Sequence, residues 1–157
     1  MPLRTATLGL MLATAVLSFP IHSAQGADSI AGTWELNVAK SKSTAPLPMS
    51  QTRTYEVTGQ QEKMIAKGVD AQGKPTLSQF TANRDGKDYP FQSPGADMIS
   101  LTPVDGSTND YVVKNAGKEV ITGTRVISKD GKVMTLSSKG TDAAGRPTES
   151  TLVFDKS

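Results

Sequence analysis

The ten-residue phrase KGVDAQGKPT occupies residues 67–76, and a close copy, KGTDAAGRPT, occupies residues 139–148. Both copies keep an aspartate, a glycine and a proline at the same offsets, namely Asp70, Gly73 and Pro75, and Asp142, Gly145 and Pro147. Aspartate opens turns by bonding its own backbone, glycine supplies a positive φ, and proline suits the first position of a strand. The phrase therefore predicts one type of hairpin connection, used twice after duplication of a hairpin. A calcium loop is the alternative, but such a loop needs several oxygen ligands, and each copy has one carboxylate.

Short segments of alternating or β-branched residues surround both copies and fill the chain from residue 32 onward. In GTWELNV (residues 32–38), Trp34, Leu36 and Val38 alternate with polar residues, which is typical of a half-buried strand. Similar segments follow at 51–58, 62–69, 76–82, 88–91, 96–104, 110–115, 119–128, 133–139 and 148–155. No connection between them is long enough for a crossover helix, so the sheet should be antiparallel. We predict an all-β fold, an up-and-down meander of roughly 8–10 strands that closes into a barrel.

The first 26 residues have the order of a secretory signal peptide. A basic residue, Arg4, precedes an apolar run over residues 6–19, and small residues precede the predicted cleavage after Gly26. Cleavage after Ala24 or Ala27 is an alternative, and so is a retained N-terminal anchor. The apolar run is shorter than the roughly 20 residues that span a bilayer. We expect a periplasmic or secreted protein, without a membrane span after cleavage, that folds as a single domain over residues 27–157.

Composition limits the chemistry available to the chain. It has no cysteine, and its one histidine, His22, lies in the predicted signal peptide. The mature protein therefore lacks the Ser-His-Asp and Cys-His arrangements of nucleophilic catalysis and the usual ligands of zinc and copper. The full chain has 17 basic and 15 acidic residues, which nearly balance, and no basic run is interleaved with aromatics, which argues against nucleic acid as a partner. We expect a monomer that is not an enzyme and needs neither cofactor nor metal.

Two short motifs resemble those of the calycin superfamily, which includes the lipocalins and the fatty-acid-binding proteins. GTW at residues 32–34 is similar to the G-x-W motif that opens the first strand, and NDY at residues 109–111 is similar to the lipocalin T-D-Y motif. The long opening of the mature chain also resembles small exported bacterial proteins described as lipocalin-like. The chain departs from the lipocalin pattern after Arg125, where a hairpin replaces a helix. It departs from the fatty-acid-binding proteins after the first strand, where the loop is too rich in proline for a helical lid.

The resemblance implies a calycin-like barrel around a small apolar ligand, and it gives structural roles to Gly32, Trp34, Tyr111 and Arg125. Trp34 would plug the base of the barrel, with ligand contact as the alternative. Arg125 shares a strand face with Ile121 and Ile127, and the resemblance implies that it stacks on Trp34.

The candidate ligand-binding residues are Arg53 and Tyr55, which lie two apart in a strand and therefore share a face. If that face is inward, a guanidinium and a phenol could hold a ligand carboxylate. If it is outward, the pair lies on a solvated sheet face.

Three functions remain open. The first is a binding protein for a small apolar or amphipathic ligand. The second is a structural or envelope-associated barrel filled by its own side chains. The third is an enzyme, for which the sequence offers no distinctive pair of acids. A cavity of a few hundred Å³ would favour the first over the second.

Overall fold

The computed structural model describes residues 28–157, and the predicted signal peptide lies outside the described residues. Eleven strands and two short 3₁₀ helices make up this part of the chain. In order they are η1 (Asp28–Ile30), β1 (Gly32–Leu36), η2 (Val38–Lys40), β2 (Lys42–Ser43), β3 (Ser50–Thr58), β4 (Gln61–Val69), β5 (Pro75–Asn83), β6 (Asp88–Ser93), β7 (Ala96–Pro103), β8 (Thr108–Asn115), β9 (Lys118–Ile127), β10 (Val133–Thr141) and β11 (Pro147–Lys156).

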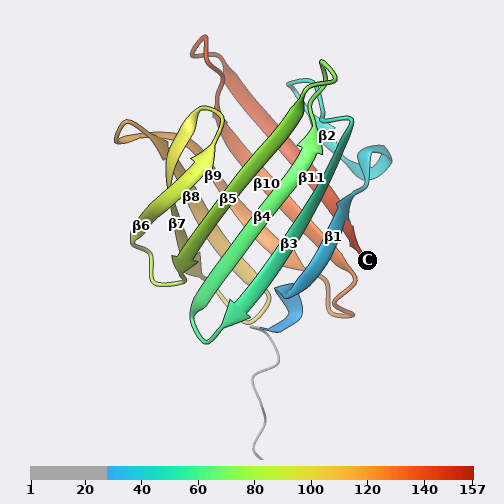
Figure 1. The fold of residues 1–157 in the computed structure, drawn as a ribbon, viewed down its shortest axis with the longest axis vertical. Coiled ribbons are helices and arrows are strands. Elements are labelled where there is room, and N and C mark those ends of the chain that lie inside the picture. The colour runs from blue at the N-terminus through green and yellow to red at the C-terminus, as the bar shows by residue number, and fades with distance from the viewer. Residues whose placement is uncertain (1–27) are drawn as a thin grey trace, which may run out of the picture.

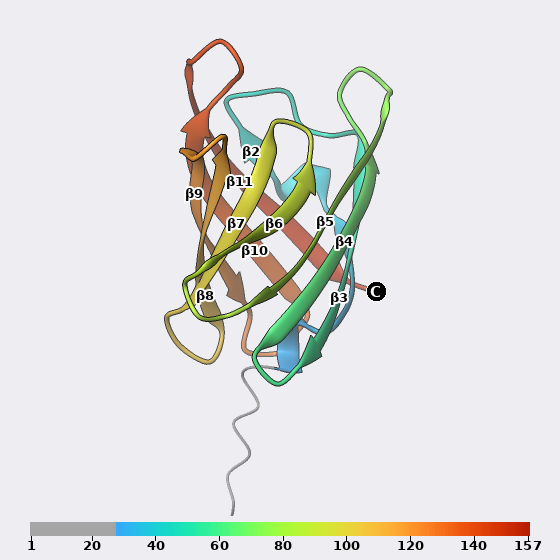
Figure 2. The same cartoon turned by 60° about the vertical axis from the view of Figure 1, so that its left-hand side comes forward.

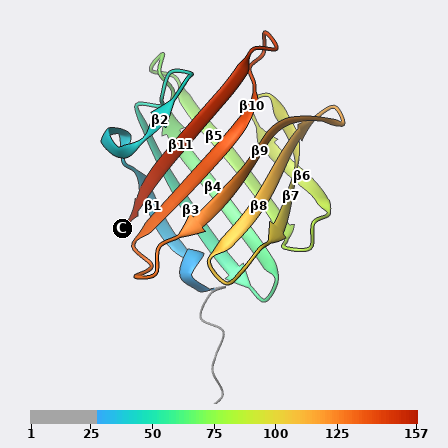
Figure 3. The same ribbon diagram turned by 180° about the vertical axis from the view of Figure 1, so that it is seen from behind.

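The strands form one closed antiparallel barrel (Figure 1). From β3 to β11 each strand pairs with the next along the chain, and β1 closes the ring by pairing with both β3 and β11. The two-residue strand β2 lies outside the ring and adds to β11, as the view from behind shows (Figure 3). The prediction of an antiparallel meander that closes into a barrel is therefore confirmed.

The repeated phrase forms the β4–β5 and β10–β11 connections. In the first copy the Asp70 carboxylate accepts bonds from the backbone N–H groups of Gln72 and Lys74, at 2.9 and 2.8 Å. In the second copy Asp142 does the same for residues 144 and 146, at 2.9 Å each. The glycine of each copy has a positive φ, 80° and 78°, and the proline begins the next strand. Both hairpins project from the same end of the barrel (Figure 2), and the predicted turn chemistry is confirmed.

The opposite end of the barrel is filled by a hydrophobic plug. Trp34 is completely buried, and its indole Nε1 donates a hydrogen bond of 2.7 Å to the carbonyl of Ile30 in η1. Met134 and Phe154 are also completely buried in the same core cluster. The prediction that Trp34 is a core residue at the base of the barrel is confirmed. Within residues 28–157, the plug therefore lies at the end of the barrel opposite the repeated hairpins.

Candidate ligand-binding site

The barrel encloses a cavity of about 280 Å³. Apolar side chains from most of its strands line it, namely Met64, Ala66, Phe80, Phe91, Ile99, Leu101, Val113, Ile121, Leu136 and Leu152. Trp34 and the other plug residues are not part of the lining. The cavity therefore lies above the plug, with a wall that suits an apolar ligand body.

Small polar side chains mark the end of the cavity nearest the repeated hairpins. Ser78 and Ser93 are hydrogen bonded to each other at 2.8 Å, and Ser138 and Ser150 at 2.9 Å. All four line the cavity. Ser78, Ser138 and Ser150 each lie three residues from the end of their strand that joins a repeated hairpin. The cavity is therefore polar at this end and bounded by the plug at the other.

Arg53 and Tyr55 both line the cavity, so the inward alternative for this pair is the correct one. The register explains why: Arg53 is the cross-strand partner of Trp34, and partners in an antiparallel pair share a face. The Arg53 guanidinium lies 5.0 Å above the Phe154 ring. Its Nε donates to Oε1 of Gln51 at 2.8 Å, and its Nη1 donates to the Tyr55 hydroxyl at 3.5 Å.

Arg53 carries an unbalanced charge. Within residues 28–157, none of the carboxylates that form ion pairs is paired with Arg53. Its two side-chain partners, Gln51 and Tyr55, are neutral. A guanidinium on the wall of a cavity, without a counter-ion, has the chemistry that suits an anion.

A buried ion pair crosses the barrel next to the plug. Glu62 on β4 and Arg125 on β9 face each other from opposite walls, five strands apart in either direction around the ring. The guanidinium donates from Nη1 to Oε1 at 2.6 Å and from Nη2 to Oε2 at 2.8 Å, and both side chains are almost fully buried. Burial alone would lower the pKa of Arg125, but the charge and hydrogen bonds of Glu62 outweigh it and raise that pKa, so Arg125 stays charged.

Tyr111 extends the polar part of the wall. Its ring lies directly against Gly123 of the neighbouring strand, where a Cβ atom would stand 2.5 Å from the phenol oxygen. A glycine is required there because any side chain would displace the ring. Burial raises the pKa of the Tyr111 phenol, against the opposing charge of Arg53, so this phenol is neutral at ordinary pH.

The predicted stacking of Arg125 on Trp34 is wrong. The cation over the Trp34 ring is Lys156, whose Nζ lies 5.0 Å from the ring centroid and donates to the carbonyl of Ser29 at 3.0 Å. Lys156 is the cross-strand partner of Trp34 on β11, whereas Arg125 lies 5.3 Å over the ring of Tyr55. Gly32 begins β1 with a φ of 121°, beside the Lys156 side chain.

Two functional candidates were not predicted from the sequence, Glu62 and Asn109. In the sequence, each of them falls at a position of its strand where the alternation would place an apolar residue. Glu62 shares a face with Met64 and Ala66, which are buried, and Asn109 shares a face with Tyr111 and Val113. A polar residue in phase with an apolar face is the pattern that would have found them.

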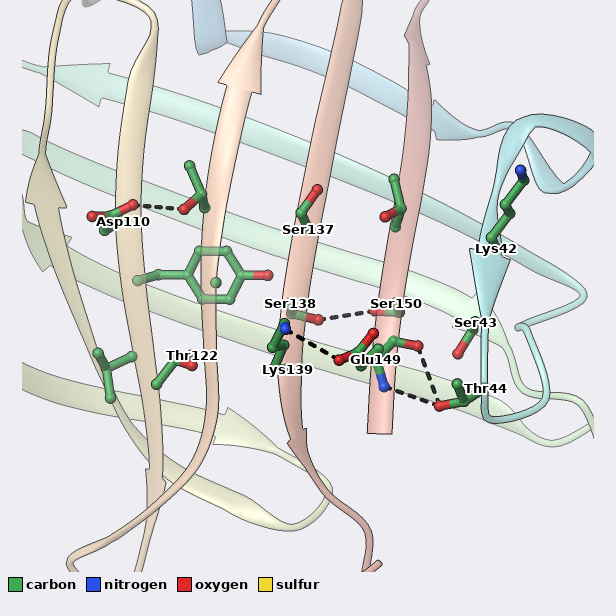
Figure 4. A pocket seen from close by; sticks show the side chains of 15 residues that line it. Lys42, Ser43, Thr44, Asp110, Thr122, Ser137, Ser138, Lys139, Glu149 and Ser150 are labelled. Atoms are coloured by element: carbon green, nitrogen blue, oxygen red, sulfur yellow. Dashed lines mark hydrogen bonds and ion pairs between the residues drawn. The ribbon is translucent and has the colours of Figure 1, made fainter. Parts of the chain in front are cut away.

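A second, more open hollow lies on the outer face of β8 to β11 beside β2 (Figure 4). A row of polar residues crosses it in register, namely Asp110, Thr124, Ser137, Thr151 and Lys42. Within the row Thr124 donates to Asp110 at 2.7 Å, and beside it Lys139 pairs with Glu149 at 3.2 Å. This hollow is a solvated sheet face, so the interior cavity is the candidate site.

In residues 28–157, histidine, cysteine and acidic side chains do not gather in the groups of three or more that could hold a metal ion. Over the same residues, none of the helices is long and apolar enough to cross a membrane.

Comparison with known proteins places the fold. No family model matches the sequence, and none of the curated proteins matches it significantly. Among solved structures, zebrafish ileal bile acid-binding protein complexed with cholic acid is similar, with a TM-score of 0.53 and 11% identity over 82% of this chain and 99% of that one. The redesigned β-barrel mFAP1 bound to DFHBI gives a TM-score of 0.47 and 14% identity, over 84% of this chain and 99% of that one. Lobster apocrustacyanin A1 gives a TM-score of 0.44 and 16% identity, over 83% of this chain and 62% of that one. At such identities the likeness concerns the fold, and the protein has the calycin-like barrel that the G-x-W motif suggested.

Proposed function

We propose that this protein is an exported binding protein that holds a small amphipathic acid in its barrel. One observation carries the proposal: half of the residues that line the cavity are apolar, and the guanidinium on its wall, Arg53, has no carboxylate partner among the described residues. The ligand's acid group would lie against Arg53 and the Tyr55 hydroxyl. Its apolar body would lie against the Phe80 and Phe91 side of the cavity.

The cavity supports binding over the alternative of a barrel filled by its own side chains. A filled interior would leave no space beyond the plug, and about 280 Å³ stands open here. The structurally similar zebrafish protein was crystallised with cholic acid, which is itself a carboxylic acid with an apolar body. That likeness supports the class of ligand, while Arg53 supports the acid group.

The experiment compares octanoic acid with octan-1-ol by isothermal titration calorimetry of the mature protein. We expect the acid to bind more tightly than the alcohol at neutral pH, because only the acid gains a charge-assisted hydrogen bond. The Arg53→Met variant should lose about tenfold or more in affinity for the acid and little for the alcohol, since hydrogen bonds to charged groups are worth about 1.5–3 kcal/mol.

The matched control is Arg84→Met. Arg84 lies at the plugged end, donates to the carbonyl of Gly59 at 2.8 Å and does not line the cavity. Its variant should bind octanoic acid like the parent. Equal losses in both variants, or no binding of any acid, would contradict the proposal, and native mass spectrometry of protein purified from its host would then decide whether the interior is filled.

A further inference from the structure

Two buried polar atoms without a hydrogen-bond partner stand out among residues 28–157. They are Nε of Arg125 and Oδ1 of Asn109. Both residues line the cavity, and they are direct cross-strand partners on β9 and β8. An unused donor and an unused acceptor therefore lie side by side on the cavity wall.

The unused donor follows from the ion pair that crosses the barrel. Arg125 gives Nη1 and Nη2 to the two oxygens of Glu62, and this bidentate contact fixes the guanidinium plane. Its Nε–H has no partner, and Arg125 is only 4% exposed. Buried polar groups are almost always hydrogen bonded, so an orphan that faces a cavity points to a group that enters it.

The pair of atoms selects one kind of group. A carboxylate would meet Arg125 favourably but would place its oxygens against the Asn109 carbonyl oxygen. An ammonium would be repelled by the guanidinium. A hydroxyl both accepts and donates, so it can accept from Nε–H of Arg125 and donate to Oδ1 of Asn109.

We propose that the inner end of the cavity is a hydroxyl-binding subsite formed by Arg125 and Asn109, so that the protein selects amphipathic acids with a hydroxyl remote from the acid group. The inference rests on the proposed function, because Arg53 holds the acid group. Tyr55 links the two subsites: its hydroxyl lies 3.5 Å from Nη1 of Arg53, and its ring lies 5.3 Å below the Arg125 guanidinium. Both subsites therefore contact the same tyrosine, which describes a short ligand.

The test titrates the mature protein with hexanoic, octanoic and decanoic acids and with their terminal hydroxy counterparts. Adding a hydroxyl to a ligand that enters an apolar cavity normally weakens binding, because the hydroxyl loses its water. We expect the opposite at one chain length: the hydroxy acid should bind about tenfold more tightly than the unsubstituted acid of the same length.

The variant Asn109→Leu removes the acceptor. We expect it to abolish the preference for the hydroxy acid, measured in this variant as the ratio of its affinities for the hydroxy acid and for the unsubstituted acid of the same length. The control is Asn115→Leu, the same substitution at an exposed position on the same strand, which should keep the preference. Circular dichroism checks that both variants fold, and the length series on the parent protein tests the subsite even if Asn109→Leu does not.

The outcomes separate the two proposals. If none of these acids binds, the proposed function fails. If the acids bind through Arg53 but the hydroxyl gives no gain at any length, the subsite is overturned and the proposed function stands. Tighter binding of octanedioic acid than of 8-hydroxyoctanoic acid would also overturn it, because the inner end would then take an anion.

Discussion

Replacing Arg125 with methionine should strongly destabilise the barrel. The substitution leaves the Glu62 carboxylate, whose side chain is 0% exposed, without the two hydrogen bonds that now satisfy it. Breaking a buried ion pair by removing one partner typically costs about 3–5 kcal/mol. Domains of this size have a free energy of unfolding of about 5–15 kcal/mol, so the variant should lose a large share of its stability.

The double variant Glu62→Leu/Arg125→Met gives the sharper result. Removing both charges also removes the cost of burying them, and such replacements are often neutral or stabilising. We expect the double variant to be more stable than Arg125→Met alone. If the two losses were additive, the double variant would instead lose more stability than either single variant. The exposed pair of Lys139 and Glu149, with side chains 78% and 64% exposed, supplies the control: Lys139→Met should cost less than about 1 kcal/mol.

The assay is equilibrium unfolding in urea at pH 7, followed by the emission of Trp34. This residue is the only tryptophan and is fully buried, so its fluorescence reports the loss of the plug. A loss below 1 kcal/mol in Arg125→Met would refute the reasoning. So would a double variant that loses the sum of the two single changes, because the two charges would then act independently.

Three further predictions concern the turn aspartates, the plug and the N-terminus of the mature protein. Backbone hydrogen bonds in the turns lower the pKa of Asp85, Asp105 and Asp142 in the folded protein. These carboxylates should therefore contribute their full stability above the unfolded pKa of about 3.9 and lose it as the pH falls through their lower folded pKa values. An equal urea midpoint at pH 7 and pH 3 would contradict this. Trp34→Phe and Lys156→Ala should be non-additive by more than about 0.5 kcal/mol in a double-mutant cycle, and simple additivity would remove Lys156 as the partner of the indole. The mature protein should begin between residues 25 and 28, and N-terminal sequencing of exported protein that returns Met1 would exclude cleavage of a signal peptide.

Much of the fold could be predicted because the turns are encoded locally. The aspartate, glycine and proline of each repeated phrase act on backbone groups within five residues of one another, so the hairpins follow from the sequence alone. Alternation also placed Arg53 and Tyr55 on one face. Which face it was depended on the pairing of Arg53 with Trp34, a contact between strands that the sequence does not specify.

The candidate site was harder to predict because its contacts cross the barrel. Glu62 and Arg125 are 63 positions apart in the chain and lie on opposite walls, so no local pattern joins them. Lys156 reaches Trp34 because the last strand closes against the first, whereas the family resemblance favoured Arg125. Strand order around the ring decides which cation reaches the indole, and this order becomes visible only in three dimensions.

The closure of the ring by its first and last strands has a consequence for how the chain folds. Trp34 meets Lys156 almost at the end of the sequence, and contacts between such distant residues slow folding. During synthesis the sheet keeps two unpaired edges until the ten residues of β11 have left the ribosome. Open edges pair readily with other chains. A chain truncated before residue 147 therefore cannot seal its barrel, and we expect it to aggregate rather than to fold into a smaller domain.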